Sequence, residues 1–217
     1  CVDLEHSVID FYEAEILIAT IQSKGIMPFV RVGYNNEMII KKVLDAGAQG
    51  IIVPMVNSKK DALQAVNSVK YPPQGNRGVG LARAQNYGFN FEEYAKNINS
   101  QINVIAQIEH IDAIANLEEI LSVDGIDGTI IGPYDLSGSM GKPGQYDDDD
   151  VKEILSKYET ISKKLNKPMG YHVIKPDHSA MLEKIENGYT FLAFSLDTVF
   201  LGSICRSEMK KLHEKLK

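Results

Sequence analysis

The chain has 217 residues and a formal net charge of −6 at pH 7, with 44% hydrophobic and 24% charged residues. This is the composition of an ordinary globular domain, and its acidic balance disfavours a nucleic-acid-binding surface, which is usually basic. No apolar run reaches the ~20 residues of a membrane-spanning helix, and no signal peptide is visible. Because Cys1 and Cys205 are too far apart for a metal motif, we expect a reduced, cytoplasmic protein without membrane partners.

Short β-rich segments alternate with longer segments of helical periodicity, which is the pattern of βα units around a parallel sheet. The predicted strands are 1–5, 27–32, 50–56, 103–109, 128–133, 168–173 and 189–197. The predicted helices are 8–24, 37–47, 59–69, 91–99, 110–123, 151–165, 177–188 and 198–217. Gly47 is expected to end the second helix, and Ser58 with Asp61 to cap the third.

Two stretches between these elements have an unusual length or charge. Residues 71–88 form a loop that is too long for an ordinary βα connection, which favours a functional role. In this loop Arg77 is predicted to be structural, whereas Arg83 is either a cation over the active site or an exposed charge. The four aspartates 147–150 are predicted to form a solvated helix N-terminus rather than a metal site, because the helix dipole favours acids there.

The order of the predicted elements indicates one α/β domain over residues 1–217. No strand is followed by the glycine fingerprint of a dinucleotide-binding fold, since GNRGVG at 75–80 follows a Pro-Pro loop. The chain opens inside a strand, with Cys1 in place of Met. We therefore predict a (β/α)8 TIM barrel that lacks its first βα unit, since such barrels have about 250 residues.

Barrel active sites lie at the C-terminal ends of the strands, and two carboxylates are predicted to meet there. Glu109 and Asp135 are 26 residues apart, about one βα repeat, and are expected on neighbouring strands ~4.8 Å apart. Two ionised carboxylates so close in a partly dehydrated barrel mouth require a compensating charge. A hard divalent cation would supply it. The alternatives are that one carboxylate pairs with an arginine or caps a helix.

His6 and Arg31 show the same spacing, 25 residues apart at the ends of the first two strands. An imidazole beside a guanidinium predicts a base next to an oxyanion anchor. A satisfied surface histidine is the alternative for His6 alone. Asp3 is expected to orient the His6 ring, as carboxylates often do. No lysine stands at a strand end, and Lys175 falls just past one, which argues against Schiff-base chemistry.

Several motifs along nearly the whole chain also resemble a known family. They are DLEHS, PFVRV, KKVLDAGAQGIIVPMVN, YPPQGNRGVG, QIE and IIGPYDLSGSMG. Together they resemble the metal-dependent class II pyruvate aldolases of the 4-hydroxy-2-oxoheptanedioate aldolase/citrate lyase superfamily. The resemblance implies a barrel of the phosphoenolpyruvate/pyruvate type with a further βα unit before residue 1. It also implies a carbon–carbon lyase that reversibly cleaves a 4-hydroxy-2-oxo acid to pyruvate and an aldehyde.

The resemblance implies a catalytic role for each of five residues. Glu109 and Asp135 would be the protein ligands of a divalent ion, Mg²⁺, Mn²⁺ or Co²⁺, with no organic cofactor. Arg31 would contact the pyruvyl oxygen and stabilise the enolate. His6, oriented by Asp3, would act in acid–base chemistry, and a metal-bound water is the alternative base.

The resemblance also implies supporting residues and an assembly. Gln107 would line the site near the metal, and backbone N–H groups of Tyr134 and Asp135 would hold the substrate carboxylate. Asp45 would be a supporting residue at a subunit boundary. The family is typically a homohexamer, a trimer of dimers, in which C-terminal helices (here 198–217) are exchanged between subunits. Its partners are a small 2-oxo acid and an aldehyde.

Two positions depart from the family pattern, and they leave the aldehyde open. Many members have Gly where this chain has Leu4, and Ala where it has Tyr134, so both are expected to reshape the pocket. A lyase acting on a CoA thioester is one alternative, but the acidic balance gives no support to a site for the CoA phosphates. A non-catalytic barrel that binds an oxo acid is another, and the complete set of implied residues argues against it.

Overall fold

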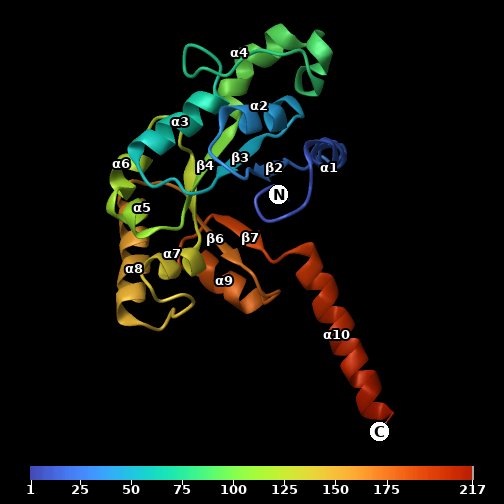
Figure 1. The fold of residues 1–217 in the computed structure, drawn as a ribbon, viewed down its shortest axis with the longest axis vertical. Helices are drawn as coiled ribbons and strands as arrows, with labels where there is room; N and C mark the ends of the chain where they lie inside the picture. The colour runs from blue at the N-terminus through green and yellow to red at the C-terminus, as the bar shows by residue number, and fades with distance from the viewer. Residues whose placement is uncertain (217) are drawn as a thin grey trace.

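The computed structural model describes residues 1–216, and a curled, all-parallel sheet lies at its centre (Figure 1). Within these residues the strands follow one another in chain order from β1 to β7, so that β1 and β7 are the sheet edges. The strands are β1 (Val2–Asp3), β2 (Phe29–Arg31), β3 (Gly50–Val53), β4 (Asn103–Ile108), β5 (Gly128–Ile131), β6 (Met169–Val173) and β7 (Phe191–Phe194). Each lies within a predicted strand and is shorter.

Helices follow the strands, as the βα pattern predicts. They are α1 (Phe11–Ser23), α2 (Glu37–Asp45), α3 (Lys59–Val69), the 3₁₀ helix η1 (Arg83–Gly88), α4 (Phe91–Gln101), α5 (Ile111–Ala115), α6 (Leu117–Leu121), α7 (Pro133–Ser139), α8 (Asp149–Lys164), α9 (His178–Glu186) and α10 (Asp197–Lys215). Lys217, the last residue of the predicted helix 198–217, lies outside the described residues. No helix in the described part of the chain is long and apolar enough to cross a membrane.

The structure corrects the predicted helices in three places. The single helix predicted over 110–123 is divided into α5 and α6 at Asn116, which leaves helical geometry (φ −101°, ψ 11°). Its side-chain amide instead donates to the carbonyl of Asn57 (2.9 Å). Helix α7 forms where a polar loop was predicted, and η1 forms inside the long loop 71–88. They have seven and six residues, too few to show a helical period in the sequence.

The predicted helix ends are confirmed. Gly47 follows α2 with a positive φ of 107°, and the Ser58 hydroxyl accepts a hydrogen bond from the Asp61 N–H (3.2 Å). Asp148 caps α8 by accepting from the Asp150 N–H (3.0 Å), and Lys142 bridges these two aspartates at 2.7 and 2.5 Å. The acidic run therefore stabilises a helix N-terminus, and no group of three metal-ligating side chains is found among residues 1–216.

Arg77 and Arg83 both fasten the long loop to the body of the domain. The buried Arg77 donates from Nη2 to Asp45 Oδ1 (2.7 Å), and its guanidinium lies 4.6 Å from the ring centroid of Tyr71. This confirms the predicted structural role of Arg77. Arg83 donates from Nη1 to the side chain of Gln22 and the carbonyl of Ala46 (each 2.7 Å). It is therefore neither a cation over the active site nor a free surface charge.

The alternation of side chains along the strands positions the site residues. One hydrophobic cluster lies on the sheet face away from the helices, formed around Ile52, Ile105 and Ile130 with Phe29 and Phe191 packed against them. Because side chains on one face recur every second residue, Arg31 and Gln107 point to the same face as Phe29 and Ile105. In the ladder Arg31 is the partner of Ile52 and Gln107 is the partner of Ile130, so these polar residues lie directly beside the apolar cluster.

Candidate active site

Arg31, at the end of β2, pairs with two carboxylates from the end of β1, those of Asp3 and Glu5. Asp3 and Arg31 are direct partners in the β1–β2 ladder. Arg31 donates from Nε to Asp3 Oδ1 (2.8 Å) and from Nη2 to Asp3 Oδ2 (2.5 Å), a bidentate pair. Glu5 Oε2 lies 3.2 Å from Nη1 of the same guanidinium. These contacts fix the plane of the Arg31 fork at the mouth of the sheet.

The expected orientation of the His6 ring by Asp3 is not found. The Asp3 carboxylate faces Arg31 and also accepts from the backbone N–H groups of Glu5 (3.0 Å) and His6 (3.4 Å). Strand pairing places a guanidinium directly beside Asp3, and a charge-assisted fork is stronger than a single bond to an imidazole. The carboxylate nearest the ring is that of Glu5, whose Oε2 lies 3.8 Å from His6 Nε2. The His6 side chain is 71% exposed at the rim.

Glu5 stands at the end of the first predicted strand, but the sequence-based reasoning gave it no role in the site. Its side chain lies between Arg31 and His6, and its Oε2 atom is buried without a hydrogen-bond partner. Burial raises the pKa of the Glu5 carboxyl; the Arg31 charge opposes this rise, and the charge of Glu109 adds to it. The sequence contains one signal for a role of Glu5. In the motif DLEH, Glu5 comes two residues after Asp3, which pairs with Arg31.

Glu109 is buried and fixed by two donors. Its Oε1 accepts from the backbone N–H of Met55 (2.8 Å), and its Oε2 accepts from Nε2 of Gln107 (2.5 Å). Met55 presents that N–H with a positive φ of 52°, a conformation that a non-glycine residue adopts at an energetic cost. Gln107 therefore lies beside Glu109, and its side-chain amide orients the Glu109 carboxylate.

Glu109 and Asp135 converge on Gly132, at the end of β5. A Cβ atom built on Gly132 would lie 3.3 Å from Glu109 Oε2 and 3.9 Å from Asp135 Oδ2. The two carboxylates therefore border one small space that only glycine leaves open. Among residues 1–216, neither carboxylate forms a salt bridge, so the arginine alternative is not found. Glu109 caps no helix, whereas Asp135 lies in the first turn of α7, so a helix terminus does favour one of the two carboxylates.

This space fits a hard divalent cation. It offers two carboxylates, and no third metal-ligating side chain joins them in the described part of the chain. Mg²⁺ and similar ions are commonly held by one or two protein carboxylates while substrate and water oxygens complete the shell. Asp135 and Tyr134 lie in the first turn of α7, where backbone N–H groups lack partners within the helix. The Tyr134 ring is 58% exposed beside them.

Asp45 is the one predicted site residue that the structure does not bring into this group. Its carboxylate pairs with Arg77 in the anchor of the long loop. Asp45 ends α2, which runs back antiparallel to the strands, so it lies toward the opposite end of the sheet. Asp45 therefore anchors the long loop through Arg77, and its supporting role at a subunit boundary stays a prediction.

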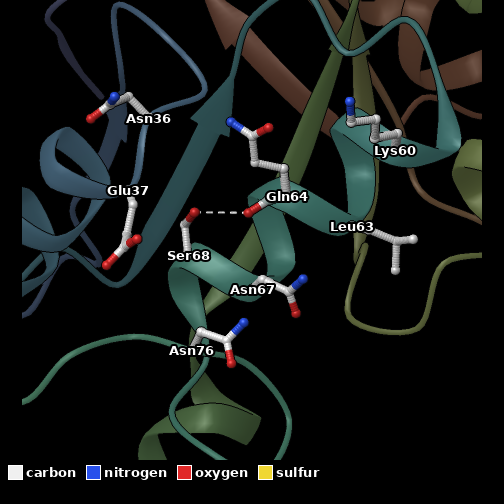
Figure 2. Close-up of a pocket in the computed structure, with 8 residues that line it drawn as sticks. All are labelled: Asn36, Glu37, Lys60, Leu63, Gln64, Asn67, Ser68 and Asn76. Atoms are coloured by element: carbon white, nitrogen blue, oxygen red, sulfur yellow. Dashed lines mark hydrogen bonds between the residues drawn. The ribbon is translucent and has the colours of Figure 1, made fainter.

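Two surface hollows lie on the β3–α3 side of the domain. One has a volume of about 490 Å³ and extends from Glu5 and His6 past Met55 to Gln64 on α3. The other, about 470 Å³, lies over α3 and is lined by amide side chains, with Gln64 shared between the two (Figure 2). Only the first contains a predicted site residue, so we treat it as part of the active site.

The sequence profile of the HpcH/HpaI aldolase/citrate lyase family matches residues 1–201. The chain belongs to this family. A hydroxypyruvate/pyruvate aldolase from Sagittula stellata is 39% identical over 92% of this chain and 78% of its own length. A 2-keto-3-deoxy-L-rhamnonate aldolase from Klebsiella pneumoniae is 37% identical over 91% of this chain and 74% of its own length. The crystal structure of an HpcH/HpaI aldolase from Desulfitobacterium hafniense is 31% identical, with a TM-score of 0.91 over 98% of this chain and 82% of that protein.

These comparisons confirm two predictions. The family is the one that the motifs indicate, and the named relatives support the predicted class, a pyruvate-type aldolase. The curled parallel sheet agrees with the solved family structure. The roles of the individual residues stay predictions, and the geometry above is the basis on which we propose them.

The Asp3–Arg31 pair predicts a pH-dependent stability. Partial burial alone would raise the pKa of Asp3, but bonds from Arg31 and the backbone outweigh it, so the pKa lies below its ordinary value. The contribution is therefore complete above the ordinary pKa of about 3.9 and is lost as the pH falls through the lower folded-state value. Asp3→Asn should lower the free energy of unfolding by about 2 kcal/mol at pH 7, measured by urea denaturation in EDTA.

The matched control is Glu5→Gln, for which the opposite sign is expected. The raised pKa of Glu5 means that its ionised form weakens the fold at pH 7, and this penalty disappears as the pH falls below the ordinary value. The Gln variant should be at least as stable as the parent chain at pH 7. An Asp3→Asn variant as stable as the parent at pH 7 would contradict the assigned pair.

Proposed function

We propose that the protein is a metal-dependent aldolase that reversibly cleaves a 4-hydroxy-2-oxo acid to pyruvate and an aldehyde. The observation that carries this proposal is the convergence of Glu109 and Asp135 on Gly132, on the same sheet rim as the fixed guanidinium of Arg31. A paired carboxylate site and an oxyanion donor are what the chemistry of a pyruvate enolate requires. The names of the relatives support pyruvate as the common product.

Glu109 and Asp135 would hold the ion, with Mg²⁺, Mn²⁺ and Co²⁺ as the candidates. When bound, such an ion supplies Lewis-acid stabilisation of the negative charge that develops on a substrate oxygen. The chain prepares this position in advance, because Gln107 and the Met55 N–H orient Glu109 from behind. No organic cofactor is needed for the reaction.

The remaining steps fall to side chains and backbone groups of this chain. The C3–C4 bond breaks, its electron pair passes to C3 and onto the keto oxygen, and Arg31 donates hydrogen bonds to that oxygen. Asp3 and Glu5 keep the guanidinium plane in place, so little reorganisation accompanies the charge shift. We assign to His6 the acceptance of the C4 hydroxyl proton, and C3 then takes up a proton to give pyruvate.

The first turn of α7 would bind the substrate carboxylate. Backbone N–H groups of Tyr134 and Asp135 are free of helical partners there, and a helix N-terminus favours an anion. The exposed Tyr134 ring stands beside that position and would narrow the mouth. This arrangement would fix the oxo acid at its carboxylate while Arg31 meets its keto oxygen.

Loss of the guanidinium fork should disable enolate formation. Pyruvate C3 protons should exchange with D₂O in the presence of Mg²⁺, Mn²⁺ or Co²⁺, measured by NMR, and EDTA should stop the exchange. Arg31→Lys should slow it at least about 100-fold, because a point charge does not reproduce the planar fork. Exchange that is insensitive to EDTA, or equally fast in Arg31→Lys, would refute the proposed function.

We also propose that the sheet belongs to a (β/α)8 barrel in which an eighth strand lies between β1 and β7. The free edges of these two strands and the apolar layer inside the curl support this. An experimental structure with β1 paired directly to β7 would contradict the eight-stranded barrel.

The two exposed cysteines, which form no disulfide, support the proposed cytoplasmic location.

Helix α10 supports a homo-oligomer, which we propose is a hexamer that exchanges this helix between subunits. The helix extends away from the domain, and none of its described residues is buried (Figure 1). Leu201 and Ile204 are 69% and 65% exposed, and Cys205, Met209 and Leu212 continue the apolar stripe at helical spacing. So large an exposed apolar stripe is typical of a protein interface.

Charges in this stripe should dissociate the assembly. Leu201→Glu with Ile204→Glu should shift the mass measured by light scattering after size exclusion to that of a smaller species, since unpaired charges would be buried at the interface. The matched control is Lys210→Glu with Lys211→Glu, which changes exposed charges on the same helix. An unchanged mass in the first variant, or a monomeric parent chain, would exclude the proposed exchange.

A further inference from the structure

We propose that the pocket beside His6 binds the aldehyde portion of the substrate and selects neutral, hydroxylated aldehydes over anionic or alkyl ones. The inference rests on the proposed function, because it assigns the second substrate of the same site. It follows from where the pocket lies, which charges line it and which polar atoms in it lack partners.

The pocket starts at the groups that would handle the aldehyde carbon. The end of the pocket nearest the paired carboxylates is lined by Glu5, His6 and Met55, and the Met55 N–H donates to the proposed metal ligand Glu109. From there it continues to Asn35, in the β2–α2 loop, and to Gln64 on α3. A substrate whose C4 oxygen meets His6 would therefore extend its further carbons into this space. A volume of about 490 Å³ is in the usual range for small-molecule sites, roughly 300–1,000 Å³.

The charges around the pocket disfavour an anion. Glu5 and Asp61 contribute carboxylates to the lining, which contains no lysine or arginine among the described residues. The nearby Arg31 is already engaged by Asp3 and Glu5. A phosphate, sulfonate or carboxylate on the aldehyde would meet two carboxylates without a free cation to pair with.

An unpartnered acceptor favours a hydroxyl group. Asn35 Oδ1 is buried without a hydrogen-bond partner, whereas Glu5 Oε2 lies 3.2 Å from Arg31 Nη1. The Asn35 amide is fixed in this orientation, because its Nδ2 donates to the backbone carbonyl of Asp61 (2.9 Å) while Gln64 Nε2 donates to the backbone carbonyl of Asn35 (2.6 Å). A substrate O–H group would satisfy Asn35 Oδ1. An alkyl chain would leave this oxygen unpaired, and that loss is a strong source of discrimination between substrates.

The experiment compares three-carbon aldehydes in the aldol addition to pyruvate. The full chain is assayed with Mn²⁺, and kcat/KM is measured for D-glyceraldehyde, D-glyceraldehyde 3-phosphate and propanal. D-Glyceraldehyde should exceed each of the others by about tenfold or more. A kcat/KM for the phosphorylated aldehyde or for propanal that equals or exceeds that of D-glyceraldehyde would overturn the inference.

Two substitutions test whether this pocket causes the preference. Gln64→Lys adds a cation to the lining and should raise the ratio of phosphorylated to neutral aldehyde kcat/KM by about tenfold. Asn35→Ala should reduce the preference for D-glyceraldehyde over propanal. The matched control is Asn67→Lys, one turn further along α3 in the neighbouring hollow (Figure 2), which should leave both ratios unchanged. Equal ratios in Gln64→Lys and Asn67→Lys would assign the aldehyde to another surface.

Pyruvate exchange separates this inference from the proposed function. Ratios within each variant cancel a general loss of activity, and exchange of pyruvate protons needs no aldehyde. If exchange occurs but the aldehyde order is not found, only the aldehyde pocket is refuted. If exchange with metal is absent, the proposed function fails and the inference fails with it.

Discussion

The carboxylates of Glu109 and Asp135 border one small space beside Gly132, and the account of this site depends on that placement. Parallel strand register brings the two groups together, Glu109 from the position after β4 and Asp135 from the first turn of α7, which follows β5. Glu109 is buried and oriented by two donors, so it is not free to turn away from its neighbour. A dication is the group that relieves this arrangement without an arginine partner.

The charges of the residues at the rim of the sheet also favour a bound cation. Arg31 pairs with the carboxylates of Asp3 and Glu5, whereas the carboxylates of Glu109 and Asp135 on the same rim have no cationic partner among residues 1–216. The imbalance is visible at Glu5, whose pKa is raised by burial and by the charge of Glu109 despite the opposing charge of Arg31. A bound dication would remove this imbalance. The strained backbone of Met55 is consistent with a site selected for geometry at some expense in stability.

Much of this fold was predictable because buried parallel strands and amphipathic helices carry different apolar periods. All seven described strands fall within predicted ranges, and the spacing of Glu109 and Asp135 predicted them at neighbouring strand ends, where both side chains lie near Gly132. The partner of Asp3 was not predictable, since Asp3 could face His6 along the chain or Arg31 across the ladder. Only the register of β1 on β2 decides between them. The role of Glu5 was missed for the same reason.

Manganese binding to the purified chain tests the paired-carboxylate site most directly. Electron paramagnetic resonance should detect one bound Mn²⁺ per chain, and Glu109→Gln and Asp135→Asn should each weaken binding at least about tenfold. Asp112→Asn, which removes an exposed carboxylate from the neighbouring helix α5, should bind as the parent chain does. Unchanged affinity in both the Glu109 and Asp135 variants would show that the ion, and with it the proposed chemistry, does not belong at this position.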